Sequence, residues 1–253
     1  MNRFWAGVRF LTVFPVPFNW GTREGDLAGS AVFFPVIGGL IGTFAGLLVW
    51  ALGLWTGDLL TGVLTTVFLI SVSGGLHMDG LSDTADGFFS ARSEQRMLEI
   101  MRDPHIGAMG VMAIVSIFCI KAVAIAGAPA MLRWHVVCLM PLAGRCALVL
   151  TMAILPYARP DGGLGTIFFD RPPRISALFA PALLGAVCVW AGGWTGAIVA
   201  VGTVILTLAL AFYTFRKIGG ATGDTLGATC EVVECVPALL FPLVSGFQAD
   251  GIL

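Results

Sequence analysis

Long apolar runs separated by short polar segments dominate this chain. A transmembrane helix needs about 20 mostly apolar residues. The stretches that meet this requirement are 32–55, 58–76, 107–127, 133–155, 175–193 and 196–216. A further apolar stretch, Val236 to Phe247, is short and contains Pro237 and Pro242, so it is either a re-entrant piece or a distorted final helix. The pattern predicts an all-α fold, a polytopic integral membrane helical bundle with about six to seven transmembrane helices.

The composition indicates that lipid is the main solvent. Of the 253 residues, 57% are hydrophobic and only 11% are charged, which leaves too little polar surface for a water-soluble protein of this size. We therefore expect a single membrane domain, 1–253, with membrane lipid as a partner and no nucleic acid. The apolar stretch 10–18 is short, contains two prolines and has no cleavage site after it. This pattern favours an interfacial or re-entrant segment over 1–31 rather than a secretory signal.

The positions of Lys and Arg predict the orientation. With the N-terminus inside, the outer loops contain one basic residue, Arg133, and the inner side contains eleven. The eleven are Arg3, Arg9, Arg23, Arg92, Arg96, Arg102, Arg159, Arg171, Arg174, Arg216 and Lys217. Because cytoplasmic loops carry the excess of Lys and Arg, the polar segments 77–106 and 216–235 are predicted to face the cytoplasm. Lys121 and Arg145 fall inside predicted spans, where an ionisable residue is a functional or pairing residue by default.

The segment 74–102 is the densest polar sequence and contains three regularly spaced aspartates. Asp79, Asp83 and Asp86 are four and three residues apart, so on a helix they share a sector of about 60°. Carboxylates near a membrane boundary must face water, a cavity or a cation. Oxygen ligands suit magnesium, which commonly combines one or two carboxylates with substrate phosphate oxygens. The alternative is a solvated helix start, where Asp is common.

Basic and imidazole side chains accompany these aspartates. Arg92, Arg96 and Arg102 follow on the same side of the membrane and are candidate phosphate ligands, although anchoring to anionic lipid would need the same residues. His77 is a candidate proton acceptor, or else a hydrogen-bonded structural residue. Candidates without an assigned role complete the segment: Glu99, Asp103 and His105.

A second polar segment, 216–235, follows the span 196–216. Asp224, Glu231 and Glu234 share about 80° of a helical wheel, and flexible glycines precede them. If both polar segments lie on one side of the membrane, Asp224 can join the metal site, with Glu231 and Glu234 in supporting positions. The alternative is a helix start capped by Thr222 or Asp224, with the acidic residues on its wet face.

Three segments resemble one enzyme family. They are GGLHMDGLSDTADGFFSARSEQRMLEIMRDPHIGAMG (74–110), GGATGDTLGATCEVVE (219–234) and RFLTVFPVP (9–17). Together they resemble the adenosylcobinamide-GDP ribazoletransferase, or cobalamin synthase, family. The departures from the family pattern that we recognise are Met78 and Ser82, and neither affects a carboxylate. Over 128–215 the resemblance rests mainly on hydropathy.

The resemblance implies a magnesium-dependent phosphotransferase of a bacterial inner membrane, with its site facing the cytoplasm. Its substrates would be adenosylcobinamide-GDP and α-ribazole or α-ribazole 5′-phosphate, and its products adenosylcobalamin or adenosylcobalamin 5′-phosphate, and GMP. The metal-ligand candidates are Asp79, Asp83, Asp86 and Asp224. The candidates for accepting the hydroxyl proton are Asp83, Asp86 and His77. The candidate phosphate ligands are Arg92, Arg96, Arg102 and Arg145. A homo-oligomer is compatible with the sequence.

Two other functions compete with this interpretation. A CDP-alcohol phosphotransferase also uses membrane-embedded aspartates at helical spacing, but its motif resembles DGxxAR followed by GxxxDxxxD, whereas here DG precedes LSDTADG. A small transporter would use Lys121, Arg145 and the acidic clusters as an ion path. The acidic residues cluster toward one face rather than the midplane, and no inverted repeat is evident. Both observations favour the transferase.

Overall fold

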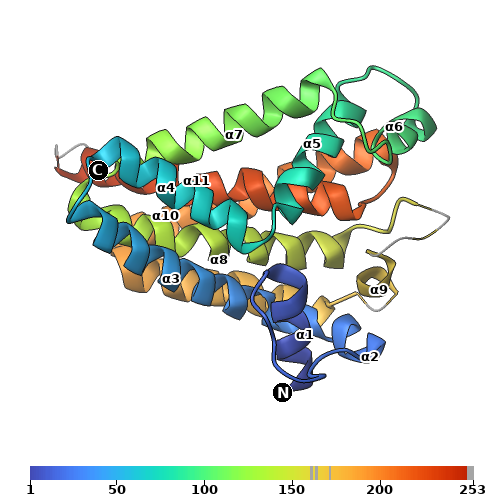
Figure 1. The fold of residues 1–253 in the computed structure, drawn as a ribbon, viewed down its shortest axis with the longest axis horizontal. Helices are drawn as coiled ribbons and strands as arrows, with labels where there is room; N and C mark the ends of the chain where they lie inside the picture. The colour runs from blue at the N-terminus through green and yellow to red at the C-terminus, as the bar shows by residue number, and fades with distance from the viewer. Residues whose placement is uncertain (160–161, 163–164, 171, 250–253) are drawn as a thin grey trace.

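The computed structural model describes residues 1–159, 162, 165–170 and 172–249, and its regular structure there is helical except for a β-bridge between Tyr157 and Ala221. Figure 1 shows the long helices side by side along one axis. The elements are α1 Asn2–Leu11, α2 Glu24–Ala28, η1 Ser30–Phe33, α3 Phe34–Gly53, α4 Asp58–Val72, α5 Leu76–Phe88, α6 Glu94–Ile100, α7 Ala108–Gly127, α8 Ala130–Ile154, α9 Thr166–Phe169, α10 Arg174–Ile218 and α11 Gly223–Ala249.

Five helices of the described residues are long and apolar enough to cross a membrane, and the bent pair α4 and α5 is a candidate for a sixth span. The five are Ser30–Gly53, Ala108–Gly127, Ala130–Ile154, Arg174–Ile218 and Gly223–Gly246. Large apolar side chains such as Phe44, Val115 and Phe212 are exposed on them, as expected for surfaces in contact with lipid. The predicted all-α membrane bundle is therefore confirmed.

The helix α10 is two helical halves rather than one rod. Gly192 and Gly193 interrupt it with non-helical backbone angles. A Cβ built on Gly196 would lie 1.7 Å from the carbonyl oxygen of Cys188, whereas eight residues of a continuous helix span about 12 Å. The chain therefore folds back at the two glycines, in agreement with the separate spans predicted at 175–193 and 196–216.

The last helix runs without interruption through the apolar stretch that the sequence left undecided. Pro237 and Pro242 both lie inside α11, so the stretch 236–247 is the second half of a spanning helix rather than a re-entrant piece. Proline is tolerated in membrane helices because neighbouring groups satisfy the freed carbonyls.

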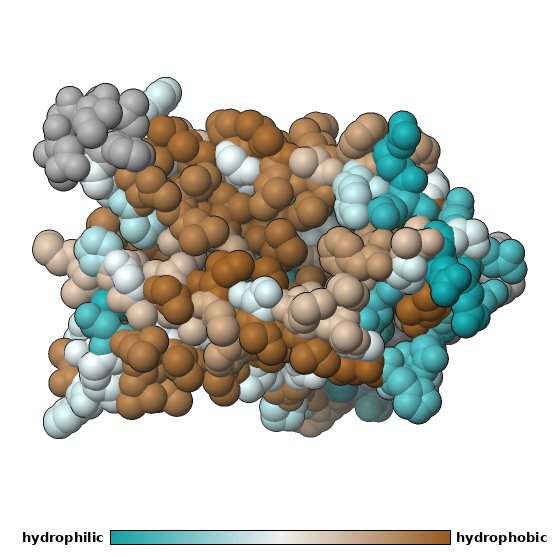
Figure 2. All heavy atoms as spheres, turned by 90° about the horizontal axis from the view of Figure 1, so that it is seen from above, coloured by the Kyte–Doolittle hydropathy of each residue, from teal (hydrophilic) through white to brown (hydrophobic). Residues whose placement is uncertain are grey.

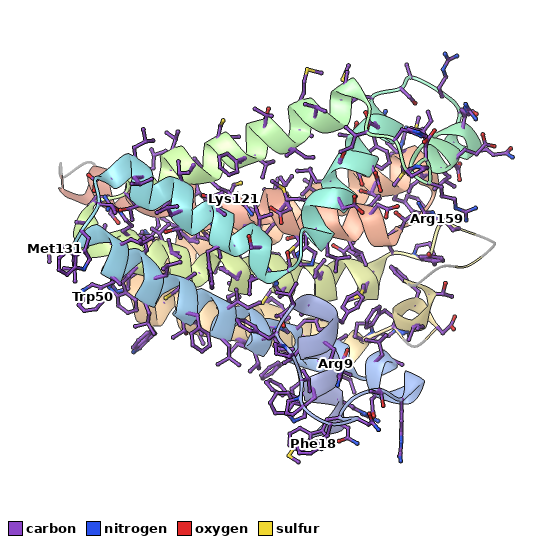
Figure 3. The ribbon with its side chains drawn as sticks, in the orientation of Figure 1. Arg9, Phe18, Trp50, Lys121, Met131 and Arg159 are labelled. Atoms are coloured by element: carbon purple, nitrogen blue, oxygen red, sulfur yellow. The ribbon has the colours of Figure 1, made fainter. Side chains whose placement is uncertain are left out.

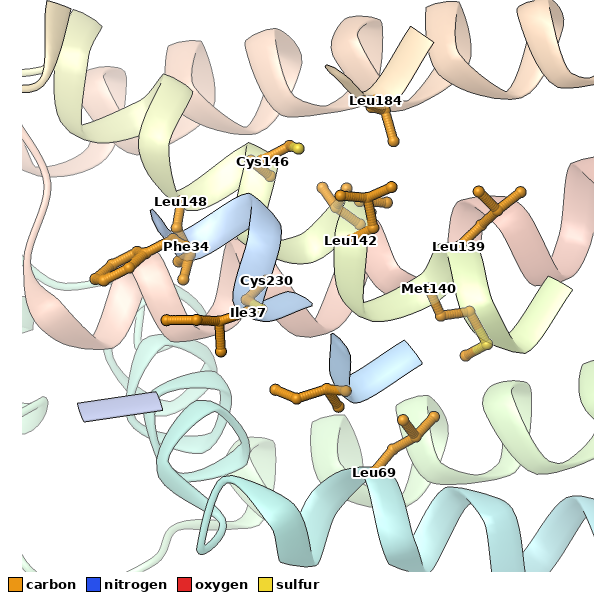
Figure 4. Packing of buried hydrophobic residues seen from close by; sticks show 14 of the residues in the cluster. Phe34, Ile37, Leu69, Leu139, Met140, Leu142, Cys146, Leu148, Leu184 and Cys230 are labelled. Carbon is orange, nitrogen blue, oxygen red and sulfur yellow. The ribbon is translucent and has the colours of Figure 1, made fainter. Parts of the chain in front are cut away.

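Glycine packing holds the central helices close together. Gly38, Gly42 and Gly46 form a stripe on α3 that faces α8, and a Cβ on Gly42 would lie 2.1 Å from the carbonyl oxygen of Cys138. Small residues at helical spacing let membrane helices approach to backbone contact. Figure 4 shows the buried side chains around this contact, among them Ile37 of α3 and Leu142 of α8.

The two ends of the bundle differ in polarity. In Figure 2, apolar side chains cover the middle of the visible face, and hydrophilic side chains gather most densely at one end. Figure 1 shows α5, α6 and the start of α11 at that end, with α1 and α2 beside the adjoining end of α3. The N-terminal segment is tied down by Arg9, whose guanidinium donates hydrogen bonds to the carbonyls of Val16, Phe18 and Trp20. This polar end contains the candidate site.

Candidate active site

The three aspartates of the first polar segment lie on one short helix. The chain turns by 90° between α4 and α5, and Gly74 and Gly75 make this turn with positive φ angles of 61° and 76°, which glycine adopts without strain. At the other end of α5, the ammonium of Lys217 donates a 3.0 Å hydrogen bond to the carbonyl of Phe88. The helix predicted from the aspartate spacing is therefore present.

Close contact between α5 and α11 brings the two acidic segments together. A Cβ on Gly80 would lie 2.7 Å from the carbonyl oxygen of Asp224, and one on Gly227 would lie 3.0 Å from the carbonyl oxygen of His77. Only residues without a side chain allow this approach. Asp224 is thereby placed beside the aspartates of α5, as the sequence analysis required for a shared site.

Asp224 has a cationic partner that the sequence analysis did not assign. A nitrogen of the Arg159 guanidinium lies 2.5 Å from a carboxylate oxygen of Asp224. Backbone pairing positions the arginine, because Ala158 N–H donates to Ala221 and Ala221 N–H donates to the carbonyl of Pro156. The sequence gives only a weak indication that Arg159 belongs to the site. Arg159 is a basic residue that lies just after a predicted span, on the inner side, in a loop with no assigned role.

The start of α11 is capped by Thr222, as the alternative interpretation of the segment 216–235 predicted. The Thr222 and Thr225 hydroxyls each accept a hydrogen bond from the other residue's backbone N–H. This reciprocal arrangement satisfies donors that a helix start leaves free. The two interpretations are therefore compatible: Thr222 caps the helix, and the side chain of Asp224 lies at the site.

Asp86 holds the start of α7. Its two carboxylate oxygens accept hydrogen bonds from the backbone N–H groups of Gly107, at 2.7 Å, and Gly110, at 2.9 Å. These donors belong to the first turn of α7, where backbone N–H groups have no partner within the helix. Both oxygens of Asp86 thus have a structural task, which distinguishes it from Asp79 and Asp83.

The electrostatics of the site leave negative charge in excess. Asp83 is repelled by Asp224, Asp79 and Asp86, and the attraction that opposes this comes from Arg159. Asp83 is half-buried, so water screens the repulsion only in part. A cation or a substrate bearing cations would lower this repulsion.

The residues fit a magnesium ion only if the substrate supplies part of its ligand shell. Among the described residues, no group of three or more His, Cys, Asp or Glu side chains lies close enough to hold a metal ion by itself. Magnesium usually keeps several waters and binds through one or two carboxylates together with substrate phosphates. Asp79 and Asp83, which lie one helical turn apart on α5, are the two carboxylates that could take this part.

A cavity of about 210 Å³, called here the chamber, lies beside these carboxylates. One end is polar and contains Asp79, Asp224, Arg159 and His77. The other end is apolar and is lined by aromatic and aliphatic side chains, Phe10, Phe34, Phe168, Leu148 and Met152 among them. The chamber therefore suits a ligand with one polar and one apolar end.

The remaining candidates of the first segment lie at the surface around α6. Arg96 pairs with Glu99 at 2.7 Å, and the ring of His105 lies 2.7 Å from Asp103. Hydrogen bonds from the backbone and ring of His105 hold the pKa of the Asp103 carboxyl below its usual range.

Two arginines share the wall of a neighbouring cavity. Arg102 and Arg159 both line a polar space of about 490 Å³ beside α6. Arg92 is exposed in the segment between α5 and α6. Of the predicted phosphate ligands, Arg102 thus shares a cavity with Arg159, and the carboxylates of Glu94 and Glu99 line the same space.

A separate ionic cluster occupies the interior of the bundle. The Lys121 ammonium lies 2.6 Å from carboxylate oxygens of both Glu231 and Glu234, and Arg145 pairs with the other oxygen of Glu234. All four side chains are buried. Figure 3 shows Lys121 well inside the bundle, whereas Arg159 lies at the polar end. The two cations of this cluster thus neutralise its two carboxylates. The predicted phosphate role of Arg145 has no support in this geometry.

A helical membrane bundle with aspartates gathered at its polar end, beside a chamber, defines the class of this protein, a polytopic membrane enzyme. The comparisons with known proteins make the class specific. The family model described as cobalamin-5-phosphate synthase matches residues 3–242, and the chain belongs to that family.

Curated relatives agree with the family match. A protein of Desulforamulus reducens is 36% identical over 90% of both chains, and one of Acetivibrio thermocellus is 35% identical over 96% of this chain and 98% of its own. A protein of Citrobacter koseri is 36% identical over 92% of this chain and 96% of its own. All three are named adenosylcobinamide-GDP ribazoletransferase. No solved structure matches the chain. The family assignment favours the transferase over the CDP-alcohol phosphotransferase and the transporter.

Proposed function

We propose that this chain joins adenosylcobinamide-GDP to α-ribazole or α-ribazole 5′-phosphate, giving adenosylcobalamin or its 5′-phosphate, and GMP. The observation that carries the proposal is the meeting of Asp79, Asp83 and Asp224 with Arg159 at the polar end of the bundle. Relatives that cover nearly the whole chain are named for this transfer. The proposed location is the inner membrane of a bacterium with the site facing the cytoplasm, as the excess of Lys and Arg at this end favours.

The transfer moves one phosphorus between two oxygens. A ribose hydroxyl oxygen of the acceptor forms a bond to the phosphorus next to cobinamide, and the bond from that phosphorus to the oxygen bridging the two phosphates breaks. GMP leaves with that oxygen and its electron pair. The hydroxyl proton passes to a nearby base, for which the candidates are His77, which lines the chamber, and Asp83, which lies on the same helix.

The protein's part in such a transfer is mainly positioning and charge stabilisation. Arg159 and Arg102 are placed to hold phosphate oxygens, since guanidinium groups match them in charge and shape. Asp79 and Asp83 would hold magnesium, with Asp224 assisting. When bound, magnesium neutralises charge on the diphosphate and fixes its orientation. Asp86 contributes by fixing α7 against α5 rather than by contact with substrate.

The test is GMP release by the detergent-solubilised chain given adenosylcobinamide-GDP and α-ribazole, with magnesium or with a chelator. We expect magnesium-dependent release that falls by about a hundredfold or more in Asp83→Asn, the range for losing an electrostatic group at a reacting centre. Asp26→Asn, on α2 and outside the lining of the chamber and its neighbouring cavities, serves as the matched control and should keep wild-type activity. Full activity of Asp83→Asn, or release unaffected by the chelator, would contradict the proposed site.

A further inference from the structure

The apolar half of the chamber is built from aromatic rings that contact one another. The ring centroids of Phe10 and Phe168 are 5.1 Å apart, and those of Phe34 and Phe168 are 5.5 Å apart. These rings come from α1, α3 and α9, and Leu148 and Met152 of α8 complete the wall. Figure 4 shows Phe34 beside Leu148 at the edge of the buried core. Elements from distant parts of the chain thus converge on one apolar pocket next to the carboxylates.

We infer that this aromatic end is the binding site for the planar base of the acceptor nucleoside, and that it determines which base is accepted. The inference rests on the proposed function and deepens it. α-Ribazole has a flat, methylated, bicyclic aromatic base at one end and ribose hydroxyls at the other. With the base among the phenylalanines, the ribose lies toward Asp79 and Asp224, which line the polar end of the same chamber.

The size of the chamber selects the smaller substrate. Its volume of about 210 Å³ is below the roughly 300 to 1,000 Å³ typical of pockets for drug-sized ligands. A corrin ring system is too large to enter. A wider cleft of about 600 Å³ shares Phe10, Leu76 and Asp79 with the chamber. The larger substrate therefore has room outside the chamber, and Asp79 lies on the boundary between the two spaces.

The chemistry of the walls distinguishes the acceptor base from guanine, the other flat base in the reaction. Guanine carries several hydrogen-bond donors and acceptors on its edge. Burying any of them without a partner costs free energy. The rings of Phe10, Phe34 and Phe168 supply none. A methylated benzimidazole has little polar edge, so an apolar pocket accepts it and disfavours guanine.

A buried polar atom at the chamber also lacks a partner in the described part of the chain. The Nδ1 atom of His77 has no hydrogen bond, although the side chain is 3% exposed and lines the chamber. Buried polar atoms are nearly always hydrogen-bonded in native proteins. A ribose hydroxyl of the acceptor would supply the missing partner at the polar end.

The test compares the KM values of the two substrates, measured by GMP release from the full-length chain. Phe168→Leu removes a ring from the pocket, and Met152→Phe narrows it without removing one. We expect Phe168→Leu to raise the KM for α-ribazole about tenfold, the scale of one lost base-stacking contact. Met152→Phe should raise this KM as well, because the added ring occupies space that the base needs. Both variants should leave the KM for adenosylcobinamide-GDP within twofold. Phe89→Leu, which truncates an exposed phenylalanine, should change neither value.

A binding measurement keeps the inference separate from the reaction. α-Ribazole alone should raise the unfolding temperature of the wild-type chain, because a ligand that binds the folded state stabilises it. The increase should be much smaller in folded Phe168→Leu or Met152→Phe. A raised KM for adenosylcobinamide-GDP alone, or unchanged KM values for both substrates, would overturn the inference. Stabilisation by α-ribazole without GMP release would instead contradict the proposed function and leave the base site supported.

Discussion

The three aspartates of α5 have different tasks although they lie about one helical turn apart. Asp79 and Asp83 face the excess negative charge of the site, whereas both oxygens of Asp86 accept hydrogen bonds from the first turn of α7. A carboxylate at a helix start satisfies free N–H groups and interacts favourably with the helix dipole. The role of each aspartate therefore depends on its partners across the helix interface, not on its position along the helix.

This difference predicts opposite phenotypes for Asp86→Ala and Asp83→Ala. Losing the bonds to Gly107 and Gly110 should lower the free energy of unfolding by about 1 to 2 kcal/mol. Asp83→Ala should leave stability unchanged or slightly higher, because it removes repulsion from Asp224 and Asp79. Thermal unfolding in detergent and GMP release, measured on both variants, check the contrast. If Asp86→Ala kept its unfolding temperature but lost all activity, Asp86 would have a direct role at the site.

The buried ionic cluster is balanced, with two cations facing two carboxylates. Removing one member of a buried ion pair leaves an uncompensated charge, which typically costs about 3 to 5 kcal/mol. Lys121→Met should therefore destabilise the bundle strongly, as measured by unfolding temperature and by the yield of folded protein. Lys121→Met combined with Glu231→Gln removes one charge of each sign and should recover much of the loss. A double variant no more stable than the single one would refute this account of the cluster.

At the scale of elements, α3 and α8 depend on the glycine stripe at Gly38, Gly42 and Gly46. A methyl group on Gly42 would meet the carbonyl of Cys138, so Gly42→Ala must push the helices apart. We expect a loss of about 1 to 3 kcal/mol, the usual range for overpacking. Gly39→Ala is the matched control, because a Cβ there meets nothing within 4 Å. Equal unfolding temperatures for the two variants would mean that the stripe does not set the packing distance.

The elements that could be predicted from the sequence are those defined by a pattern within one short segment. Apolar runs of spanning length identified the long helices, and the spacing of Asp79, Asp83 and Asp86 identified α5. The separate apolar runs at 175–193 and 196–216 also predicted where α10 folds back. Each of these features depends on residues within one or two helical turns of each other or on the length of a single run.

The missed features depend on contacts between distant segments. Arg159 and Asp224 are 65 residues apart, and Lys121 is 110 residues from Glu231. On a helical wheel, Asp224 shares a face with Glu231 and Glu234. Along α11, however, Asp224 lies at the polar end, whereas Glu231 and Glu234 lie in the bundle interior. Periodicity describes one face of one helix and does not specify which helix that face will meet. This is why the chamber could not be predicted although most of its elements were.

At the scale of the whole molecule, the polarity of the two ends predicts the orientation. If the site faces the cytoplasm, Ser93, just before α6, lies inside, and Gly57, just before α4, lies outside. A membrane-impermeant thiol reagent should label Gly57→Cys in intact cells and Ser93→Cys only after the membrane is opened. The unsubstituted chain gives the background from its native cysteines. Labelling of Ser93→Cys alone in intact cells would reverse the assigned orientation.

The ionic cluster also constrains how the chain enters the membrane. Lys121 and Arg145 belong to α7 and α8, whereas both of their acidic partners are on α11, the last helix, 89 to 113 residues later. At about 5 to 20 residues per second of synthesis, the nascent protein carries two unpaired cations for many seconds after these helices have left the ribosome. A chain that stops before α11 never neutralises them. Completion of the last helix is therefore the step at which both buried cations gain the carboxylate partners of the finished bundle.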